Sequence, residues 1–237
     1  MTIKDNQFVE KYLTPLAVLL GAIIIAFAVA FGTGGHPSLT GSQGGTGGAQ
    51  AVDIQNLTPG DSPVIGDPNA PVTMALWFDY QCPFCKQYET TTLQQVYANY
   101  IATGKVKLVL MDFQFLGNDS TTAALFARAL YESYPDKFYA WFEAMFKAQD
   151  EEGDQGFGDL PSIETLTKTI PGVDVSRVEA LMNQNKAKYQ AAIDADRQEG
   201  ATFGVNGTPG TLIGTQVFSG AVGYDQISAA LDAELKK

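Results

Sequence analysis

Hydrophobic positions in this 237-residue chain form one long uncharged run near the N-terminus and shorter segments of mixed pattern after residue 63. The run from Leu13 to Phe31 contains no charged residue. As a helix rising ~1.5 Å per residue, it would extend roughly 28 Å, close to the thickness of the hydrocarbon core of a bilayer. This pattern predicts one transmembrane helix, or an uncleaved signal anchor, over residues 13–33.

The basic residues around this run predict its orientation. Lys4 and Lys11 precede the run, and the next lysine or arginine beyond it is Lys86. By the positive-inside rule, residues 1–12 are expected in the cytoplasm and the chain after the helix outside it. A cleaved signal peptide is the alternative, because small residues between Ala26 and Ala30 match a cleavage pattern. The helix is favoured because the run exceeds the ~7–15 residues of a signal core, and both alternatives export the rest of the chain.

Residues 34–62 have the composition of a linker. Glycine, serine and threonine are frequent here, and such a composition favours a flexible tether over a packed core. The single histidine, His36, lies in this segment. Because a histidine in a flexible tether has no fixed partner, we expect it to be solvated and not to act as a ligand or a base.

Residues 63–237 carry the patterns of a folded domain of ordinary size. Apolar or alternating segments predict four strands, over Val72–Phe78, Lys105–Phe113, Thr211–Ile213 and Gln216–Ser219. Helical periodicity predicts a helix from Cys82 to a cap at Gly104, helices over Thr121–Tyr134, Pro135–Ala148, Ser162–Thr169, Val175–Met182 and Ala187–Glu199, and a last helix from Tyr224. Pro135 suits the first turn of its helix. The order of these elements predicts an α/β sandwich with a helical insertion at about residues 118–200.

Composition excludes several classes of function for this chain. With 26 acidic and 15 basic residues the net charge is -11, which would repel a phosphate backbone, so we expect no nucleic-acid partner. Two cysteines and one histidine cannot complete a closed zinc site within one chain, and they provide neither a haem attachment motif nor a histidine-based triad with its supporting ligands.

The candidate chemistry lies in the sequence Cys82-Pro83-Phe84-Cys85, where a predicted strand meets a predicted helix. Cysteines at positions i and i+3 of a helix start place both sulfurs within disulfide reach. The unpaired amides and the positive end of the helix dipole favour the thiolate of Cys82. Pro83 at the first helical position costs no hydrogen bond and makes the turn rigid. A redox role is favoured over a static disulfide or half of a metal site completed by another chain.

Sequence beyond this motif resembles the DsbA-like branch of the thioredoxin superfamily. The resemblance rests on Gly66–Thr73, on Phe78–Lys86 around the two cysteines, on Lys137–Phe146, and on Phe203–Gly214 followed by Phe218-Ser-Gly-Ala. These segments occur in the family's order and span about residues 63–237. The cysteine motif and the distal Phe203–Gly214 segment together are therefore more specific than either one alone. The resemblance implies an α/β, thioredoxin-like fold with an inserted helical subdomain.

The resemblance also implies roles for individual residues. Cys82 would be the exposed nucleophile and Cys85 the shielded resolving thiol, so that their redox-active disulfide replaces any cofactor or metal. Pro209, in a cis peptide with Thr208, would face the disulfide and keep metal ions off the two sulfurs. The backbone of Thr208 would pair with an extended substrate.

Pro83 and Phe84 complete the expected site as supporting residues. Phe84 occupies the position at which strongly oxidising relatives have histidine, and a phenyl ring gives a thiolate neither a hydrogen bond nor a charge. We therefore expect a redox potential between roughly -120 mV for the strongest oxidant and roughly -270 mV for a thioredoxin-type reductant.

A second departure from the family concerns the acid that accepts the proton of the resolving thiol. Many relatives have a buried acid six residues before the first cysteine, where this chain has Leu76. Asp79 is the nearest acid, and strand alternation directs it to the opposite face, so we do not expect it to substitute. A water molecule or Lys86 remains as the expected proton acceptor.

The sequence therefore predicts a membrane-tethered, extracytoplasmic protein thiol-disulfide oxidoreductase that introduces disulfides into exported proteins. Its expected partners are exported or unfolded cysteine-containing proteins, the membrane through the N-terminal helix, and a quinone-linked membrane oxidase or a thiol carrier. A reductase or isomerase of the same fold is the first alternative. A Cu(I)-binding module that uses Cys82 and Cys85 and an inactive peptide-binding domain are the others.

Overall fold

The computed structural model describes residues 52–150 and 157–237. The predicted cytoplasmic segment 1–12, the predicted transmembrane helix over residues 13–33, and His36 all lie outside the described residues. Within the two described ranges, no helix combines the length and apolar character that crossing a membrane requires.

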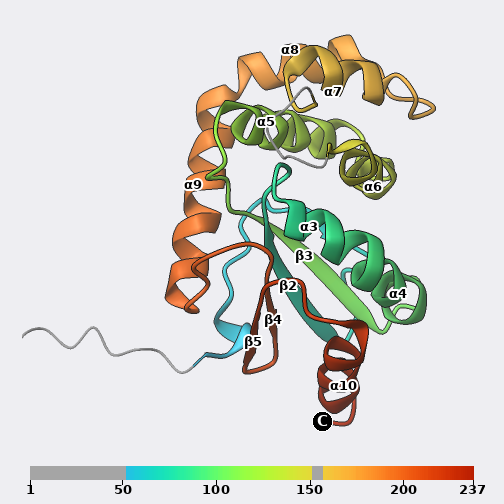
Figure 1. Ribbon diagram of the computed structural model, residues 1–237, viewed down its shortest axis with the longest axis vertical. Helices are drawn as coiled ribbons and strands as arrows, with labels where there is room; N and C mark the ends of the chain where they lie inside the picture. Colours follow the sequence, from blue (N-terminus) through green and yellow to red (C-terminus); the bar gives the residue numbers. More distant parts are fainter. Residues whose placement is uncertain (1–51, 151–156) are drawn as a thin grey trace, which may run out of the picture. The chain divides into compact units, whose positions relative to one another are not determined.

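A five-stranded mixed sheet forms the centre of the domain (Figure 1). Its strands in spatial order are β1 (Val64–Ile65), β3 (Val106–Asp112), β2 (Val72–Phe78), β4 (Gly210–Ile213) and β5 (Gln216–Ser219). β2 and β3 are parallel, and the other neighbours are antiparallel. The four predicted strands are confirmed. The fifth, β1, has only two residues, which is too short to produce an alternating pattern.

One continuous helical run follows the Cys82 motif, as predicted. It comprises α3 (Pro83–Tyr88), the π-helical turns η3 (Glu89–Leu93) and η4 (Tyr97–Ile101), and α4 (Gln94–Val96) between them. Gly104 ends the run with a φ of 73°. A residue with a side chain rarely adopts that backbone conformation, so the predicted glycine cap is confirmed.

Five helices among the described residues between β3 and β4 form the predicted insertion. They are α5 (Asn118–Ser133), α6 (Phe138–Ala148), α7 (Leu160–Thr167), α8 (Val175–Gln184) and α9 (Lys186–Thr202), and α10 (Tyr224–Glu234) ends the chain. The prediction that Pro135 lies in the first turn of a helix is wrong, because α6 begins at Phe138. Residues 135–137 form a turn instead, in which the amide of Lys137 donates to the carbonyl of Tyr134 at 3.0 Å.

Alternate residues of β2 face two separate apolar cores. Leu76 and its neighbours at the even positions join the larger core with the helices of the Cys82 motif, α6 and α10. Trp77 lies in the smaller core on the other face, where its indole nitrogen donates to the carbonyl of Asp196 on α9 at 2.8 Å. Gly200 permits this approach, since a Cβ at that position would lie 2.8 Å from the same nitrogen.

Residues 52–62 belong to the folded domain, although their composition placed them in the expected linker. Ile54 and Leu57 pack on the smaller core. The amide of Thr58 donates to Oε1 of Glu199 at 2.7 Å, and Ser62 is buried. The glycine-rich composition ends before this segment, so the predicted linker boundary at residue 62 lies too far along the chain.

A buried charge network joins the insertion to the sheet. Arg128 of α5 donates to Asp112 at the end of β3 at 2.7 Å and to Asp196 of α9. Ser62 donates to both carboxylate oxygens of Asp196 at 2.8 Å. One guanidinium faces two carboxylates here, and burial with this mutual repulsion raises the pKa of Asp196 to about 7.

Candidate active site

The loop after β2 positions the first cysteine. Asp79 directly follows the strand, and its carboxylate accepts hydrogen bonds from the amides of Gln81 at 2.8 Å and Phe115 at 2.9 Å. The amide of Cys82 donates to the carbonyl of Asp79 at 3.1 Å. Asp79 therefore holds together two loops at the end of the sheet.

Cys82 caps the N-terminus of α3. Its backbone is extended, with φ -79° and ψ 117°, and Pro83 occupies the first turn as predicted. The carbonyl of Cys82 accepts hydrogen bonds from the amides of Cys85 at 3.0 Å and Lys86 at 3.1 Å. The side chain of Phe84 is 61% exposed and does not pack against the core.

Pairing of β4 with β2 places a distant proline beside the motif. The register aligns Gly210 with Trp77, so that Pro209 reaches the end of β2 just before the cysteine loop. The peptide between Thr208 and Pro209 is cis, which confirms the prediction. The Sγ atom of Cys82 donates to the carbonyl oxygen of Thr208 at 3.4 Å.

The expected contrast in exposure between the two cysteines is wrong. Cys82 is 4% exposed and Cys85 is 3% exposed, and the two thiols are free of a disulfide in this structure. Contact with the carbonyl of Thr208 helps to cover the first sulfur as well. The two thiols differ in their hydrogen bonds and their pKa values instead.

Hydrogen bonds from Cys85 and its neighbours stabilise the thiolate of Cys82. The thiol of Cys85 makes the largest contribution, and the side chain of Thr208 and the amides of Cys85 and Phe84 add to it. Against the effect of burial, these lower the pKa of Cys82 to about 6. Burial raises the pKa of the Cys85 thiol well above its ordinary value, and the nearby Cys82 raises it further. The pair therefore combines one ionised and one protonated sulfur near neutral pH.

Neither the residue at the position of the missing buried acid, Leu76, nor its possible replacements Asp79 and Lys86 offer Cys85 an unengaged proton acceptor. Leu76 is apolar and contributes to the wall of a small cavity that Cys85 also lines. The carboxylate of Asp79 is engaged with loop amides, in keeping with the prediction that it does not substitute. Lys86 donates from Nζ to the carbonyl of Gln149 at the end of α6.

Sequence reasoning missed Glu89, which lines the same cavity as Cys85 and Pro209. Glu89 is 1% exposed, and neither of its carboxylate oxygens has a hydrogen-bond partner among the described residues. Burial, and then the charge of Glu143, raise its pKa to about 7. The signal for this residue was its spacing four positions after Cys85, on the apolar face of the predicted helix.

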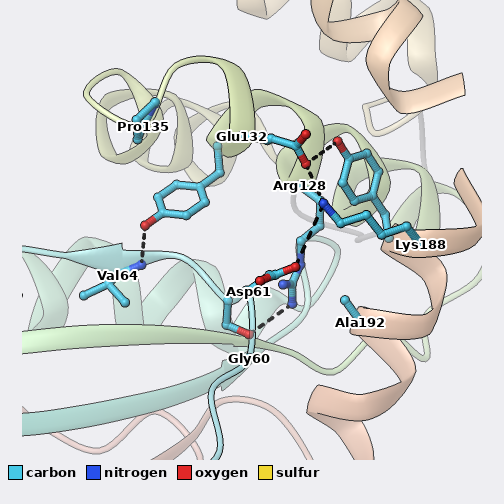
Figure 2. A pocket seen from close by; sticks show the side chains of 11 residues that line it. Gly60, Asp61, Val64, Arg128, Glu132, Pro135, Lys188 and Ala192 are labelled. Atoms are coloured by element: carbon cyan, nitrogen blue, oxygen red, sulfur yellow. Dashed lines mark hydrogen bonds and ion pairs between the residues drawn. The ribbon is translucent and has the colours of Figure 1, made fainter. Parts of the chain in front are cut away.

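Elsewhere in the described part of the chain there are three cavities that neither thiol lines. One of about 530 Å³ lies among the segment before β1, α5 and α9 (Figure 2). There Glu132 accepts from Lys188 at 2.9 Å and from Tyr189 at 3.0 Å. Within residues 52–150 and 157–237, no three histidine, cysteine, aspartate or glutamate side chains form a group that would hold a metal ion.

Comparison with known proteins extends over most of this domain. A family model described as thioredoxin matches residues 58–233. The probable disulfide bond formation protein D of Bacillus anthracis is 25% identical over 173 residues, which cover 73% of this chain and 78% of that protein. The disulfide bond formation protein D of Bacillus subtilis is 28% identical over 195 residues, covering 80% and 83% of the two chains.

Solved structures show the same architecture. Oxidised BdbD from Bacillus subtilis aligns with a TM-score of 0.68 at 24% identity, over 79% of this chain and 99% of that one, which shows likeness in fold. The thiol-disulfide exchange protein alpha-DsbA2 from Wolbachia pipientis aligns with a TM-score of 0.64 at 29% identity, over 76% and 89% of the two chains.

Proposed function

Because this chain belongs to the thioredoxin family and is a DsbA-like protein-disulfide oxidoreductase, we propose that it introduces disulfides into exported proteins through Cys82 and Cys85. The contrast between the two thiols carries this proposal. A thiolate at Cys82 is both a good nucleophile and a good leaving group. Cys85 stays protonated and acts as the resolving thiol.

Disulfide donation then proceeds in two exchanges. A substrate thiolate attacks the Cys82 sulfur of the oxidised enzyme, forming a mixed disulfide and releasing Cys85 as a thiolate that takes up a proton. A second substrate thiolate attacks the substrate sulfur of the mixed disulfide and releases the thiolate of Cys82. The substrate gains one disulfide, and the enzyme becomes the dithiol.

The surface around Cys82 supports unfolded protein as the substrate class. Phe84 beside the sulfur is 61% exposed, and Phe115 in the loop held by Asp79 is 49% exposed. Apolar rings at a site favour the apolar side chains that an unfolded chain exposes. The backbone of Thr208 is placed to pair with an extended segment whose sulfur reaches Cys82.

A reductase or isomerase is the second candidate, and the pKa of Cys82 is the observation that favours it. The value of about 6 lies between roughly 3.5 for a strongly oxidising relative and roughly 7 for thioredoxin. A Cu(I) module is disfavoured because Pro209 and Cys85 line a cavity too small to admit a water molecule.

The proposal includes the predicted location and partners. Residues 13–33 would anchor the chain in a membrane with residues 1–12 in the cytoplasm and the catalytic domain outside. An oxidase would be recharged by a quinone-linked membrane protein, whereas a reductase would draw electrons from a thiol carrier.

The decisive experiment combines an assay with a measurement in cells. The oxidised full-length protein is mixed with a reduced, unfolded protein, and disulfide formation is followed by mass-tag alkylation, with Cys82→Ser as the inactive control. The same tag reports the redox state of the pair in cells. We expect catalysis of disulfide formation and a mostly oxidised pool. A mostly reduced pool with reductase activity would assign the second function instead.

A further inference from the structure

The carboxyl group of Glu89 lies in an environment that is unfavourable for a negative charge. It is almost completely buried, and neither oxygen has a hydrogen-bond partner among the described residues. Burial of an unpartnered carboxylate is strongly unfavourable, and buried polar groups in proteins are nearly always paired. Among the described residues, Lys147 and the side chain of Gln94 favour the ionised form of Glu89, but burial and the charge of Glu143 outweigh them.

The resolving thiol is the reactive group that lies closest to Glu89 along the helix. The two residues are one turn apart, and the amide of Glu89 donates to the carbonyl of Cys85. Side chains four positions apart on a helix have Cβ atoms about 5–6 Å from each other. Both side chains line the same cavity, which has too little room for a water molecule. The other walls are apolar or aromatic, among them Leu76 and Phe78 of β2.

We propose that the carboxyl group of Glu89 exchanges a proton with the thiol of Cys85 in each half-reaction, from the helix instead of from strand position 76. This inference rests on the proposed function, because it requires Cys85 to alternate between thiol and disulfide. It also removes the need for the water molecule or Lys86 expected from the sequence. Lys86 is engaged with Gln149, and the cavity excludes water.

One proton passes between Cys85 and Glu89 during disulfide donation and returns during recharging. During disulfide donation, the S–S bond breaks and Cys85 leaves as a thiolate, which takes the proton of the Glu89 carboxylic acid. During recharging, the partner's disulfide accepts attack by Cys82. The Cys85 thiol gives its proton to the Glu89 carboxylate and attacks the Cys82 sulfur, releasing the partner's second thiolate. One proton moves in each direction, and the electrons move only between sulfurs.

Helix α6, which packs on α3 and η3 (Figure 1), supplies the charged groups that face Glu89. These are Glu143, which is partly buried, and Lys147, which is exposed. Tyr139 of α6 also interacts with Glu89, and its hydroxyl has no hydrogen-bond partner among the described residues. Tyr88, on the same helix as Glu89, is engaged with Thr211. From the sheet side the cavity receives apolar side chains.

This arrangement places both protonation states of Glu89 within reach near neutral pH. Burial and Glu143 raise its pKa, whereas Lys147 lowers it, and the result is about 7. A group that must accept a proton in one half-reaction and return it in the other works best when its pKa lies near the working pH.

Single-turnover kinetics of the reduced full-length protein with oxidised glutathione test this proposal. The first glutathione released reports attack by Cys82, and the second reports resolution by Cys85. For Glu89→Gln we expect resolution at neutral pH to slow at least about tenfold while the first step changes less than about twofold. Glu89→Asp should recover part of the rate. Glu132→Gln, a partly exposed acid outside the site, is the control and should match the natural protein.

The pH profile of resolution separates a proton acceptor from a packing residue. In the natural protein the rate should rise with an inflection near pH 7. Glu143→Gln should move the inflection to lower pH because it removes a repelling charge, and Lys147→Gln should move it to higher pH.

An unchanged rate and profile in Glu89→Gln, or an equal slowing of both steps, would overturn the role of Glu89. An absence of exchange in the natural protein would instead overturn the proposed function. The two failures are therefore distinguishable.

Discussion

The Sγ atom of Cys82 lies 3.4 Å from the carbonyl oxygen of Thr208, although 126 residues separate the two positions in the chain. This contact depends on the antiparallel pairing of β4 with β2, which brings Pro209 to the end of the strand that leads into the motif. The sulfur therefore lies beside a backbone segment able to hold an extended peptide. The proposed pairing of a substrate with Thr208 would therefore take place directly beside the reactive sulfur.

The hydrogen bond from Cys85 should set the reactivity of Cys82. In the natural protein, alkylation of Cys82 should rise with pH through an inflection near the pKa of about 6. Cys85→Ala removes the largest stabilising contact, so the pKa of Cys82 should rise and alkylation near that pH should slow by about tenfold. Cys85→Ser, which keeps a hydroxyl donor, should change the rate less. Thiolate absorbance measures the pKa of Cys82, and mass spectrometry measures its alkylation rate. Identical pH profiles for the three proteins would show that the hydrogen bond from Cys85 does not lower this pKa.

Replacing Phe84 by histidine should make the enzyme more oxidising. An imidazole at this position adds a donor or a positive charge near the sulfur, which favours the thiolate and so the reduced form. We expect Phe84→His to lower the pKa of Cys82 and to raise the redox potential by about 30 mV or more, measured by equilibration with glutathione. Phe84→Leu is the matched control, and because the ring is exposed both variants should keep their stability within about 0.5 kcal/mol. Equal potentials for the two variants would refute this prediction.

Loss of Arg128 should destabilise the domain in a pH-dependent manner. Arg128→Met leaves Asp112 and Asp196 buried without their cation, which costs about 3–5 kcal/mol near neutral pH. The pKa of Asp196 is already raised, so its carboxylate disfavours the folded state as pH rises through about 7. The loss should therefore shrink as pH falls, because burial favours the protonated form of both carboxyl groups.

Urea unfolding of the reduced protein at several pH values measures this loss. Lys188→Met serves as the comparison, since its ion pair with Glu132 is largely exposed and contributes no more than about 1 kcal/mol. A pH-independent difference between Arg128→Met and the natural protein would show that lost packing, and not the unpaired charges, causes the destabilisation.

The buried carboxyl of Glu89 should lower stability above neutral pH. Its pKa is about 7 in the folded state against an ordinary 4.5, so the folded state binds the proton more tightly and stability falls as pH rises between these values. Glu89→Gln should thus match the natural protein near pH 4 and exceed its free energy of unfolding by up to about 3 kcal/mol near pH 8. Glu132, whose pKa is lowered by Lys188, should show the opposite sign on replacement by glutamine. A Glu89→Gln variant less stable than the natural protein near pH 8 would contradict the assignment.

The N-terminal run should anchor the protein. We expect the full-length chain to sediment with membranes and resist extraction by high salt, because residues 13–33 match the hydrocarbon thickness. A reporter fused after residue 62 should be active only outside the cytoplasm, since Lys4 and Lys11 hold the N-terminus inside. Recovery of a soluble protein that begins near Phe31 would show a cleaved signal peptide and leave export intact.

Local pattern determined most of the elements of this fold. β2 was predicted to the residue because a strand with both faces covered requires consecutive apolar side chains, and its boundaries coincide with the ends of that run. The cap at Gly104 and the helix start at Pro83 depend on backbone preferences that a single residue carries. The redox motif could be recognised for the same reason, since both cysteines and the helix start that favours the thiolate of Cys82 lie within four consecutive residues.

Tertiary packing decided the features that the pattern left open. Pro135 suits a helix start, yet the chain forms a turn there, in which the amide of Lys137 donates to the carbonyl of Tyr134, and α6 begins only at Phe138. Cys82 is about as buried as Cys85, and Thr208, in the loop before β4, contacts its sulfur. Glu89 reads as one more polar helix residue until α6 covers it. Burial and the pKa values that follow from it depend on which distant segments pack together, and no short stretch of sequence contains that information.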